Sequence, residues 1–263
     1  MRTHTKWTAF AVVPLLALAG CGDKSQDANA PAKPEMLVFA GAGLRPPVAE
    51  LVDAFAKEKG VKAVTDYAGS EVLFAKIKLS QQGDIYMPGD KHYVDLAAEK
   101  GLVLAQKSIC YFVPTILVQK GNPKKIAGIK DLLKPGVRLG LGDERACAIG
   151  RKSKKMFGKN NIAWADVEKN LKFKSVTVNE LGLQIQAGSL DAVIVWDAVA
   201  RYYAKHGDEV AIPVEQNVIS TVDIGVLKFT RDRKLADALV EFAVSERGRA
   251  IFKKHNYCID APK

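Results

Sequence analysis

The sequence predicts an α/β protein made of two αβ lobes that are joined by two crossing strands. From Met36 onward, short apolar runs alternate with stretches of helical periodicity, which is typical of strands and helices in βαβ units. Two apolar runs, 109–118 and 218–227, are too long for this rhythm, and the first contains Pro114. Because proline interrupts strand pairing, the first run suits a strand that leaves one sheet and enters another.

The elements of the first lobe follow from apolar spacing and from residues that begin or end helices. They are a strand at 36–40, a helix at 47–59, a strand at 61–67, a helix after Ser70, a strand at 84–87, and a helix that Asp90 caps and Gly101 closes. Helices at 232–246 and 247–255 complete the chain. We expect lobe 1 to comprise residues 36–115 and 220–263.

The second lobe, residues 116–219, repeats the alternation. We expect a strand at 137–141, a loop at 142–150, a basic helix at 151–157, a helix at 164–171, a strand at 175–178, a helix from Asn179 to Gly188, and a strand at 190–195. This order favours largely parallel sheets covered on both faces. The hinge between two such lobes forms a cleft, where open α/β sheets bind ligands.

Two strand-to-helix turns carry the strongest indication of a binding site. The segments Val38-Phe-Ala-Gly-Ala-Gly43 and Asp66-Tyr-Ala-Gly-Ser70 each place small residues between a strand and a helix. Glycine lets a ligand approach the backbone, and a helix N-terminus offers free N–H groups with partial positive charge. Together the two turns would form an anion cradle. The alternative for each turn alone is ordinary turn chemistry, and Pro46 argues against a dinucleotide fingerprint.

The N-terminus has the features of an export signal. Arg2 and Lys6 precede an apolar core, and Leu18-Ala-Gly-Cys21 is a small-residue cleavage site that ends on cysteine. This segment resembles a bacterial lipoprotein signal, so residues 1–20 would be removed and Cys21 lipidated. Residues 21–35 are polar and rich in Pro and Ala, as expected of a flexible tether. The folded part would therefore work outside the cytoplasm, at a membrane surface.

The charge and the cysteines limit the class of protein. The net charge is +10, but the lysines are scattered along the chain, so a nucleic-acid partner is not indicated and a field that attracts small anions fits better. Besides Cys21, the chain has Cys110, Cys147 and Cys258. In an oxidising compartment they could form one disulfide and one free thiol, or remain three free thiols. No metal-ligand spacing accompanies His255 and Cys258.

Several segments resemble the periplasmic molybdate-binding proteins of ABC importers. They are Phe39-Ala-Gly-Ala-Gly43, Tyr67-Ala-Gly-Ser70, Gly83-Asp-Ile-Tyr86, the 142–150 loop, Gly188-Ser-Leu-Asp-Ala-Val-Ile-Val-Trp196 and Ile251-Phe-Lys-Lys-His255. The resemblance runs from about residue 36 to residue 256. It implies a type II periplasmic binding fold that closes on a tetrahedral oxyanion, typically molybdate or tungstate, and passes it to an ABC permease and its ATPase.

The resemblance also implies a ligand set of neutral donors: two serines, backbone N–H groups and a tyrosine hydroxyl. The second serine corresponds to Ser70, and the backbone donors correspond to Ile149 and Val178. The first serine falls on Gly43 and the tyrosine on Trp196, so two hydroxyl groups are missing. At position 43 only the backbone could serve, whereas the Trp196 indole could donate one N–H or could simply fill the hinge.

Three arginines near these turns could compensate for the missing hydroxyls. Arg45 lies in the first turn, and Arg145 and Arg151 flank the 142–150 loop. A guanidinium can contact an oxyanion through two N–H groups. The alternative for each of them is a solvated surface arginine. We include Arg45 among the candidate ligand-binding residues.

We therefore expect a monomeric, membrane-tethered solute-binding protein of an ABC importer, without catalytic activity, cofactor or protein-bound metal. Another small anion, such as a phosphonate, a sulfate-like anion or a carboxylate, is the first alternative. An extracytoplasmic thiol enzyme that uses Cys147 or Cys110 is the second, although neither cysteine has a base at a recognisable spacing. A ligand-sensing module of the same fold is the third.

Overall fold

The computed structural model describes residues 35–262. The predicted signal peptide, the lipidation site Cys21 and the tether as far as residue 34 lie outside these residues. Glu35, which we assigned to the tether, is the first residue of strand β1. None of the helices in the described part is both long and apolar enough to cross a bilayer.

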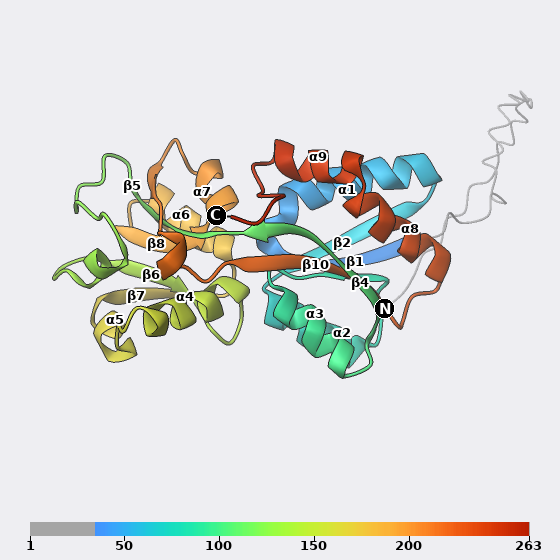
Figure 1. Cartoon of the computed structure of the whole chain (residues 1–263), viewed down its shortest axis with the longest axis horizontal. Helices are drawn as coiled ribbons and strands as arrows, with labels where there is room; N and C mark the ends of the chain where they lie inside the picture. Colours follow the sequence, from blue (N-terminus) through green and yellow to red (C-terminus); the bar gives the residue numbers. More distant parts are fainter. Residues whose placement is uncertain (1–34, 263) are drawn as a thin grey trace, which may run out of the picture. The chain divides into compact units, whose positions relative to one another are not determined.

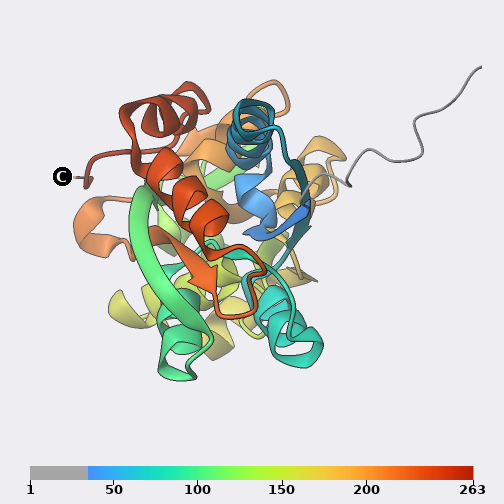
Figure 2. The same ribbon diagram turned by 90° about the vertical axis from the view of Figure 1, so that its right-hand side faces the viewer.

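The first sheet has the strand order β2-β1-β3-β10-β4. Its strands are β1 (Glu35–Gly41), β2 (Lys62–Ala68), β3 (Ile85–Met87), β4 (Val103–Phe112) and β10 (Ser220–Leu227). Strand β1 pairs in parallel with β2 and β3, whereas β10 is antiparallel to β3 and β4. Helices α1 (Arg45–Lys59), α8 (Arg233–Val244) and α9 (Glu246–Lys254) lie over one face, and α2 (Ser70–Ser80) and α3 (Lys91–Glu99) lie over the other (Figures 1 and 2). We call this sheet with its helices lobe 1.

The second sheet has the order β7-β6-β8-β5-β9 and repeats the same plan. Its strands are β5 (Pro114–Gln119), β6 (Leu139–Gly142), β7 (Leu171–Ser175), β8 (Ala192–Trp196) and β9 (Gly207–Val210). Its helices are α4 (Ala148–Lys159), α5 (Trp164–Asn170), α6 (Val178–Gln186) and α7 (Asp197–Tyr202), and together they form lobe 2. The short 3₁₀ helices are η1 (Ala42–Leu44), η2 (Ile129–Leu133) and η3 (Val214–Gln216).

The chain passes between the two sheets in two places. It leaves the first sheet at Val113, between β4 and β5, as the position of Pro114 predicts. It returns through residues 211–219. The run 218–227, predicted as a crossing strand, instead gives β10, which lies wholly in the first sheet and pairs along the length of β4. The second crossing is made by the irregular segment before β10.

The sheets are largely parallel, as predicted: four strands of each run in one direction, and one, β10 or β5, is antiparallel. Other predictions about single elements need correction. The strand predicted at 175–178 is β7 at 171–175, an edge strand whose two lysines face solvent and break the apolar run. Helix α4 begins at Ala148, three residues before the predicted start. Thr177, not Asn179, is the N-cap of α6.

Two helical glycines give opposite predictions for alanine substitution. At Gly248 in α9, a Cβ would lie 2.2 Å from the carbonyl oxygen of Phe242 and 2.5 Å from that of Ala243. Backbone atoms of α8 cannot move aside cheaply, so we expect Gly248→Ala to lower the free energy of unfolding by about 1–3 kcal/mol. At Gly158 in α4 nothing lies within 4 Å. We expect Gly158→Ala to raise the free energy of unfolding by about 0.5–1 kcal/mol, since alanine favours helix. Urea unfolding of both variants checks the difference, and equal effects would contradict it.

Candidate functional site

A small cavity lies between the two lobes, where the strand-to-helix turns of both sheets meet. The lining residues come from the turns after β1, β2, β3, β7 and β8 and from the start of α4. They are Gly41, Ala42, Gly43, Ala68, Gly69, Ser70, Gly89, Phe112, Cys147, Ala148, Ile149, Thr177, Val178 and Trp196. Ligands of open α/β sheets bind at this position, outside the carboxyl ends of the strands.

The cavity has the size of one small inorganic ion. The space open to the centre of a water molecule is about 20 Å³. A sphere of that volume has a radius of about 1.7 Å, and adding a water radius of ~1.4 Å gives a void about 3 Å in radius. One tetrahedral oxyanion fits such a void. No charged side chain is among the lining residues.

Four α-helices begin at this cavity. The N-cap residues of α2, α4, α6 and α7 all line it, and none of them caps its helix through a side chain. The first N–H of α7 donates to the Val113 carbonyl at 2.8 Å, so the free N-termini are those of α2, α4 and α6. By contrast, α3, α8 and α9 are capped by Asp90, Asp232 and Ser245, which are not among the lining residues. A helix N-terminus carries about half a positive charge, so three such ends offset most of the charge of a dianion.

Individual donors face the cavity without a protein acceptor. Within residues 35–262, no acceptor receives the backbone N–H of Ile149 or Val178. The Ser70 side chain is buried, and its Oγ accepts the N–H of Gly89 at 3.1 Å. The hydroxyl proton of Ser70 has no acceptor in the described part, so it is free to donate into the cavity.

Carbonyl groups of the same turns accept hydrogen bonds from side chains elsewhere in the chain. The Tyr86 hydroxyl donates to the Ser70 carbonyl at 2.9 Å, and the Tyr257 hydroxyl donates to the Gly43 carbonyl. The Asn179 side chain, from lobe 2, donates to the Ala42 carbonyl of lobe 1 at 3.2 Å. A carbonyl oxygen that faced an anion would repel it, so these bonds leave mainly N–H and O–H groups toward the cavity.

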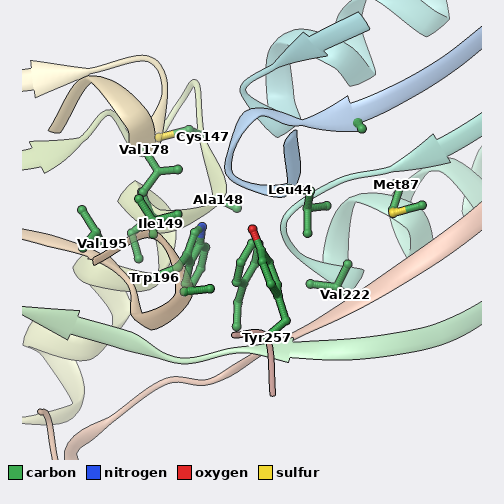
Figure 3. Packing of buried hydrophobic residues seen from close by; sticks show 14 of the residues in the cluster. Leu44, Met87, Cys147, Ala148, Ile149, Val178, Val195, Trp196, Val222 and Tyr257 are labelled. Carbon is green, nitrogen blue, oxygen red and sulfur yellow. The ribbon is translucent and has the colours of Figure 1, made fainter. Parts of the chain in front are cut away.

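Aromatic rings close one side of the cavity. The rings of Phe112 and Trp196 are stacked, with centroids 4.7 Å apart and planes 4° from parallel, and Tyr257 lies 5.2 Å from Phe112. Figure 3 shows the indole nitrogen of Trp196 and the hydroxyl of Tyr257 at the same end of their rings, on the side of Ala148. The indole N–H has no acceptor among the described residues, so it is a further donor.

The two lobes touch at Gly69, and we call this arrangement the closed form. A Cβ on Gly69 would lie 2.4 Å from the carbonyl oxygen of Ala146 and 2.6 Å from that of Val176. Both carbonyls belong to lobe 2, whereas Gly69 belongs to lobe 1. Only glycine permits this approach of the two backbones.

The structure brings five of the six candidate site residues together at the cavity, and the sixth, Arg45, does not line it. Gly43, Ser70, Ile149, Val178 and Trp196 all line the cavity.

The arginines do not line the cavity. The guanidinium of Arg45 lies over the ring of Tyr67, 4.2 Å from its centroid. Arg145 is exposed beside Asp143, and Arg151 pairs with Asp90 at 3.0 Å. The expectation that an arginine replaces the missing hydroxyls is therefore not met by this arrangement. The groups at the cavity are instead the free helix N-termini and the Trp196 indole N–H. Tyr86 and Tyr257, whose hydroxyls donate to carbonyls of the turns, were not predicted, because Tyr257 contacts Gly43 from 214 residues along the chain.

The comparison with known proteins agrees with this geometry. A family model for bacterial extracellular solute-binding proteins matches residues 36–257. The chain belongs to this family. Molybdate-binding protein ModA of Mycobacterium bovis is 26% identical over 247 residues, which span 91% of this chain and 92% of ModA.

Solved structures show the same fold. The periplasmic molybdate-binding protein of Azotobacter vinelandii has a TM-score of 0.73 at 15% identity, covering 87% of this chain and all 100% of that chain. The sulfate-binding protein SubI of Mycobacterium tuberculosis has a TM-score of 0.76 at 17% identity, covering 86% and 88%. The predicted type II periplasmic binding fold is confirmed. The family consists of binding proteins rather than enzymes, as expected.

The cysteines of this solute-binding protein give no support to the thiol-enzyme alternative. Cys110, Cys147 and Cys258 are all free, so the option of one disulfide is not the one observed. Burial raises the pKa of Cys147 to about 12, and its Sγ lies 3.6 Å from the Ser175 carbonyl oxygen, to which it donates. A thiol with such a pKa is not a nucleophile at neutral pH. In the described part of the chain, no cluster of His, Cys, Asp or Glu could hold a metal ion.

Replacing Gly69 should hold the lobes apart without unfolding them. In Gly69→Ala the clash with Ala146 and Val176 can be relieved by opening the hinge. We expect a larger radius of gyration in small-angle scattering, with a melting temperature within about 2 °C of the wild type. Gly128→Ala, where a Cβ meets nothing within 4 Å, is the control. A compact Gly69→Ala variant would contradict this account of the closed form.

Removing the Tyr257 hydroxyl should leave the Gly43 carbonyl without its donor. Both groups are buried, and an unpaired buried acceptor costs about 1–3 kcal/mol. We expect Tyr257→Phe to lower the free energy of unfolding by that amount in urea titrations. Tyr111→Phe, whose hydroxyl bonds to no other described residue, should change it by less than about 0.5 kcal/mol. Equal values for the two variants would show that the bond behind Gly43 contributes nothing.

Proposed function

We propose that this protein binds one tetrahedral oxyanion, molybdate or tungstate, in the cavity between its lobes as the solute-binding protein of an ABC importer. The observation that carries the proposal is the convergence of three free helix N-termini, those of α2, α4 and α6, on a cavity the size of one ion. Such ends bind anions without a counter-charge.

The donor-only lining favours an anion that carries no proton. The Trp196 indole and the N–H groups of Ile149 and Val178 can only donate, and Ser70 Oγ already accepts the Gly89 N–H. An anion that keeps a proton, such as monohydrogen phosphate, needs an acceptor for it. Molybdate, tungstate and sulfate, which are fully ionised at neutral pH, need none.

The volume argues against larger ligands. A cavity of about 20 Å³ has no room for the organic part of a phosphonate or a carboxylate. Sulfate remains the nearest competitor, since it shares the charge and the shape of molybdate, and one structural neighbour is a sulfate-binding protein. The identity with ModA of Mycobacterium bovis favours molybdate.

The proposal includes the location and the partners of the protein. The mature chain is held at the outer face of a membrane by a lipid on Cys21 and acts as a monomer. It captures the anion by closing its two lobes and delivers it to a permease driven by an ATPase. The family of extracellular solute-binding proteins supports this role.

Calorimetry of the purified full chain tests the ligand. We expect one-to-one binding of molybdate and tungstate, weaker binding of sulfate, and no heat with phosphate. A hundredfold excess over Kd should stabilise the fold by about 2.7 kcal/mol. No heat and no thermal shift with any of the four anions would reject the proposal.

Ser70→Ala tests the site. The hydroxyl donates to a charged ligand, a bond worth about 1.5–3 kcal/mol, so we expect Kd for molybdate to rise roughly 10- to 150-fold. Ser80→Ala, at the exposed end of the same helix, should leave Kd unchanged. An unchanged Kd in Ser70→Ala would place the anion elsewhere.

A further inference from the structure

A cluster of three charges joins the two lobes beside the neutral cavity. Asp90 belongs to lobe 1, and its side chain is only 4% exposed. Its Oδ2 lies 3.0 Å from Nη2 of Arg151 and 3.3 Å from Nζ of Lys152, both on α4 of lobe 2. Among the ion pairs of residues 35–262, those of Asp90 are the ones that bridge the lobes.

Lobe 1 holds Asp90 rigidly next to the cavity. The preceding residue, Gly89, lines the cavity, donates its N–H to Ser70 Oγ and accepts a bond from the Ser220 hydroxyl at 3.0 Å. The Oδ1 of Asp90 accepts the N–H of His92 at 3.1 Å and caps α3. One carboxylate oxygen is thus fixed to lobe 1, and the other faces lobe 2.

Lobe 2 presents the two cations from the helix that supplies its cavity donors. Ala148 and Ile149 line the cavity in the first turn of α4, and Arg151 and Lys152 follow in the same helix. Lys152 is 12% exposed and also donates to the Ile219 carbonyl in the crossing segment. Burial lowers the pKa of Lys152, while Asp90 acts in the opposite direction. The carboxylate therefore compensates a cation that closure buries.

We propose that Asp90 is a positioning residue for oxyanion binding, holding the N-terminus of α4 over the cavity and so favouring the closed form. Opening the lobes would return the three charges to water. In the closed form, loss of Asp90 would leave two like charges side by side and half-buried, which is more costly than the same loss in solvent. The ligand named in this inference rests on the proposed function, whereas the latch between the lobes does not.

A purely electrostatic role predicts the opposite sign. Asp90 adds a negative charge next to an anion site, so removing it would strengthen anion binding if the cluster only set the local field. As a latch, its removal weakens binding. The direction of the change therefore distinguishes the two roles.

Asp90→Asn is the test, because asparagine is also a good N-cap and preserves α3. The matched control is Asp232→Asn, which neutralises the exposed N-cap of α8 away from the cleft. We expect Kd for molybdate to rise roughly tenfold or more in Asp90→Asn and to change less than about twofold in the control. Small-angle scattering of the ligand-free proteins should show a larger radius of gyration for Asp90→Asn only. Equal or tighter binding, or unchanged scattering, overturns the inference.

A combined variant makes the test independent of how well the single variant folds. With Arg151→Gln and Lys152→Gln in place, Asp90 is buried without a charged partner, so adding Asp90→Asn should recover affinity and compactness. A further loss would mean that Asp90 does not act through these cations. If the wild type binds no anion at all, the proposed ligand fails. The scattering comparison still decides whether Asp90 joins the lobes.

Discussion

On the proposed function, the cost of burying an anion without a counter-charge is the constraint on which this structure depends. Water solvates a dianion strongly, so a cavity of neutral groups competes only if its donors already point inward. The free N-termini of α2, α4 and α6 provide this field at the cavity. The hydroxyls of Tyr86 and Tyr257 fix the carbonyls behind these turns. Binding strength therefore resides in the backbone, which explains why glycine and tryptophan can stand where the resemblance implies hydroxyl groups.

The matching topology of the two sheets is what brings these helix ends together. In each sheet four strands run in one direction and the fourth in the order, β10 or β5, is antiparallel to its neighbours: β2-β1-β3-β10-β4 and β7-β6-β8-β5-β9. The crossing at Val113 and the return before β10 set the two sheets edge to edge, with their strand-to-helix turns facing each other. Strand-to-helix turns of one lobe thus face those of the other lobe across the cavity. Neither lobe alone encloses an ion.

The sequence could predict what is encoded locally. Gly43, Ser70, Ile149, Val178 and Trp196 all follow apolar strands or begin helices, and each lies at the cavity. The orientation of Arg45 could not be predicted, because it depends on the ring of Tyr67 in the neighbouring strand. The partner of Arg151 lies on the other lobe, 61 residues away. The two sheets share a strand order, but the sequence shows no matching repeat. Pairing order is set by tertiary contacts rather than by residue identity.

On the proposed roles, the neutral cavity binds the ligand, and the charged cluster beside it favours closure of the lobes. These two tasks would conflict if one site performed both. A cation inside the cavity would bind a dianion tightly and would also hold it when the lobes open, because an ion pair in a low dielectric is strong. Neutral donors lose most of their effect once water enters. On the role proposed for Asp90, the attraction that favours closure lies outside the cavity, between Asp90 and the cations of α4. Opening then exposes that cluster and the ligand to water together, so the force that closes the lobes does not retain the anion after they part.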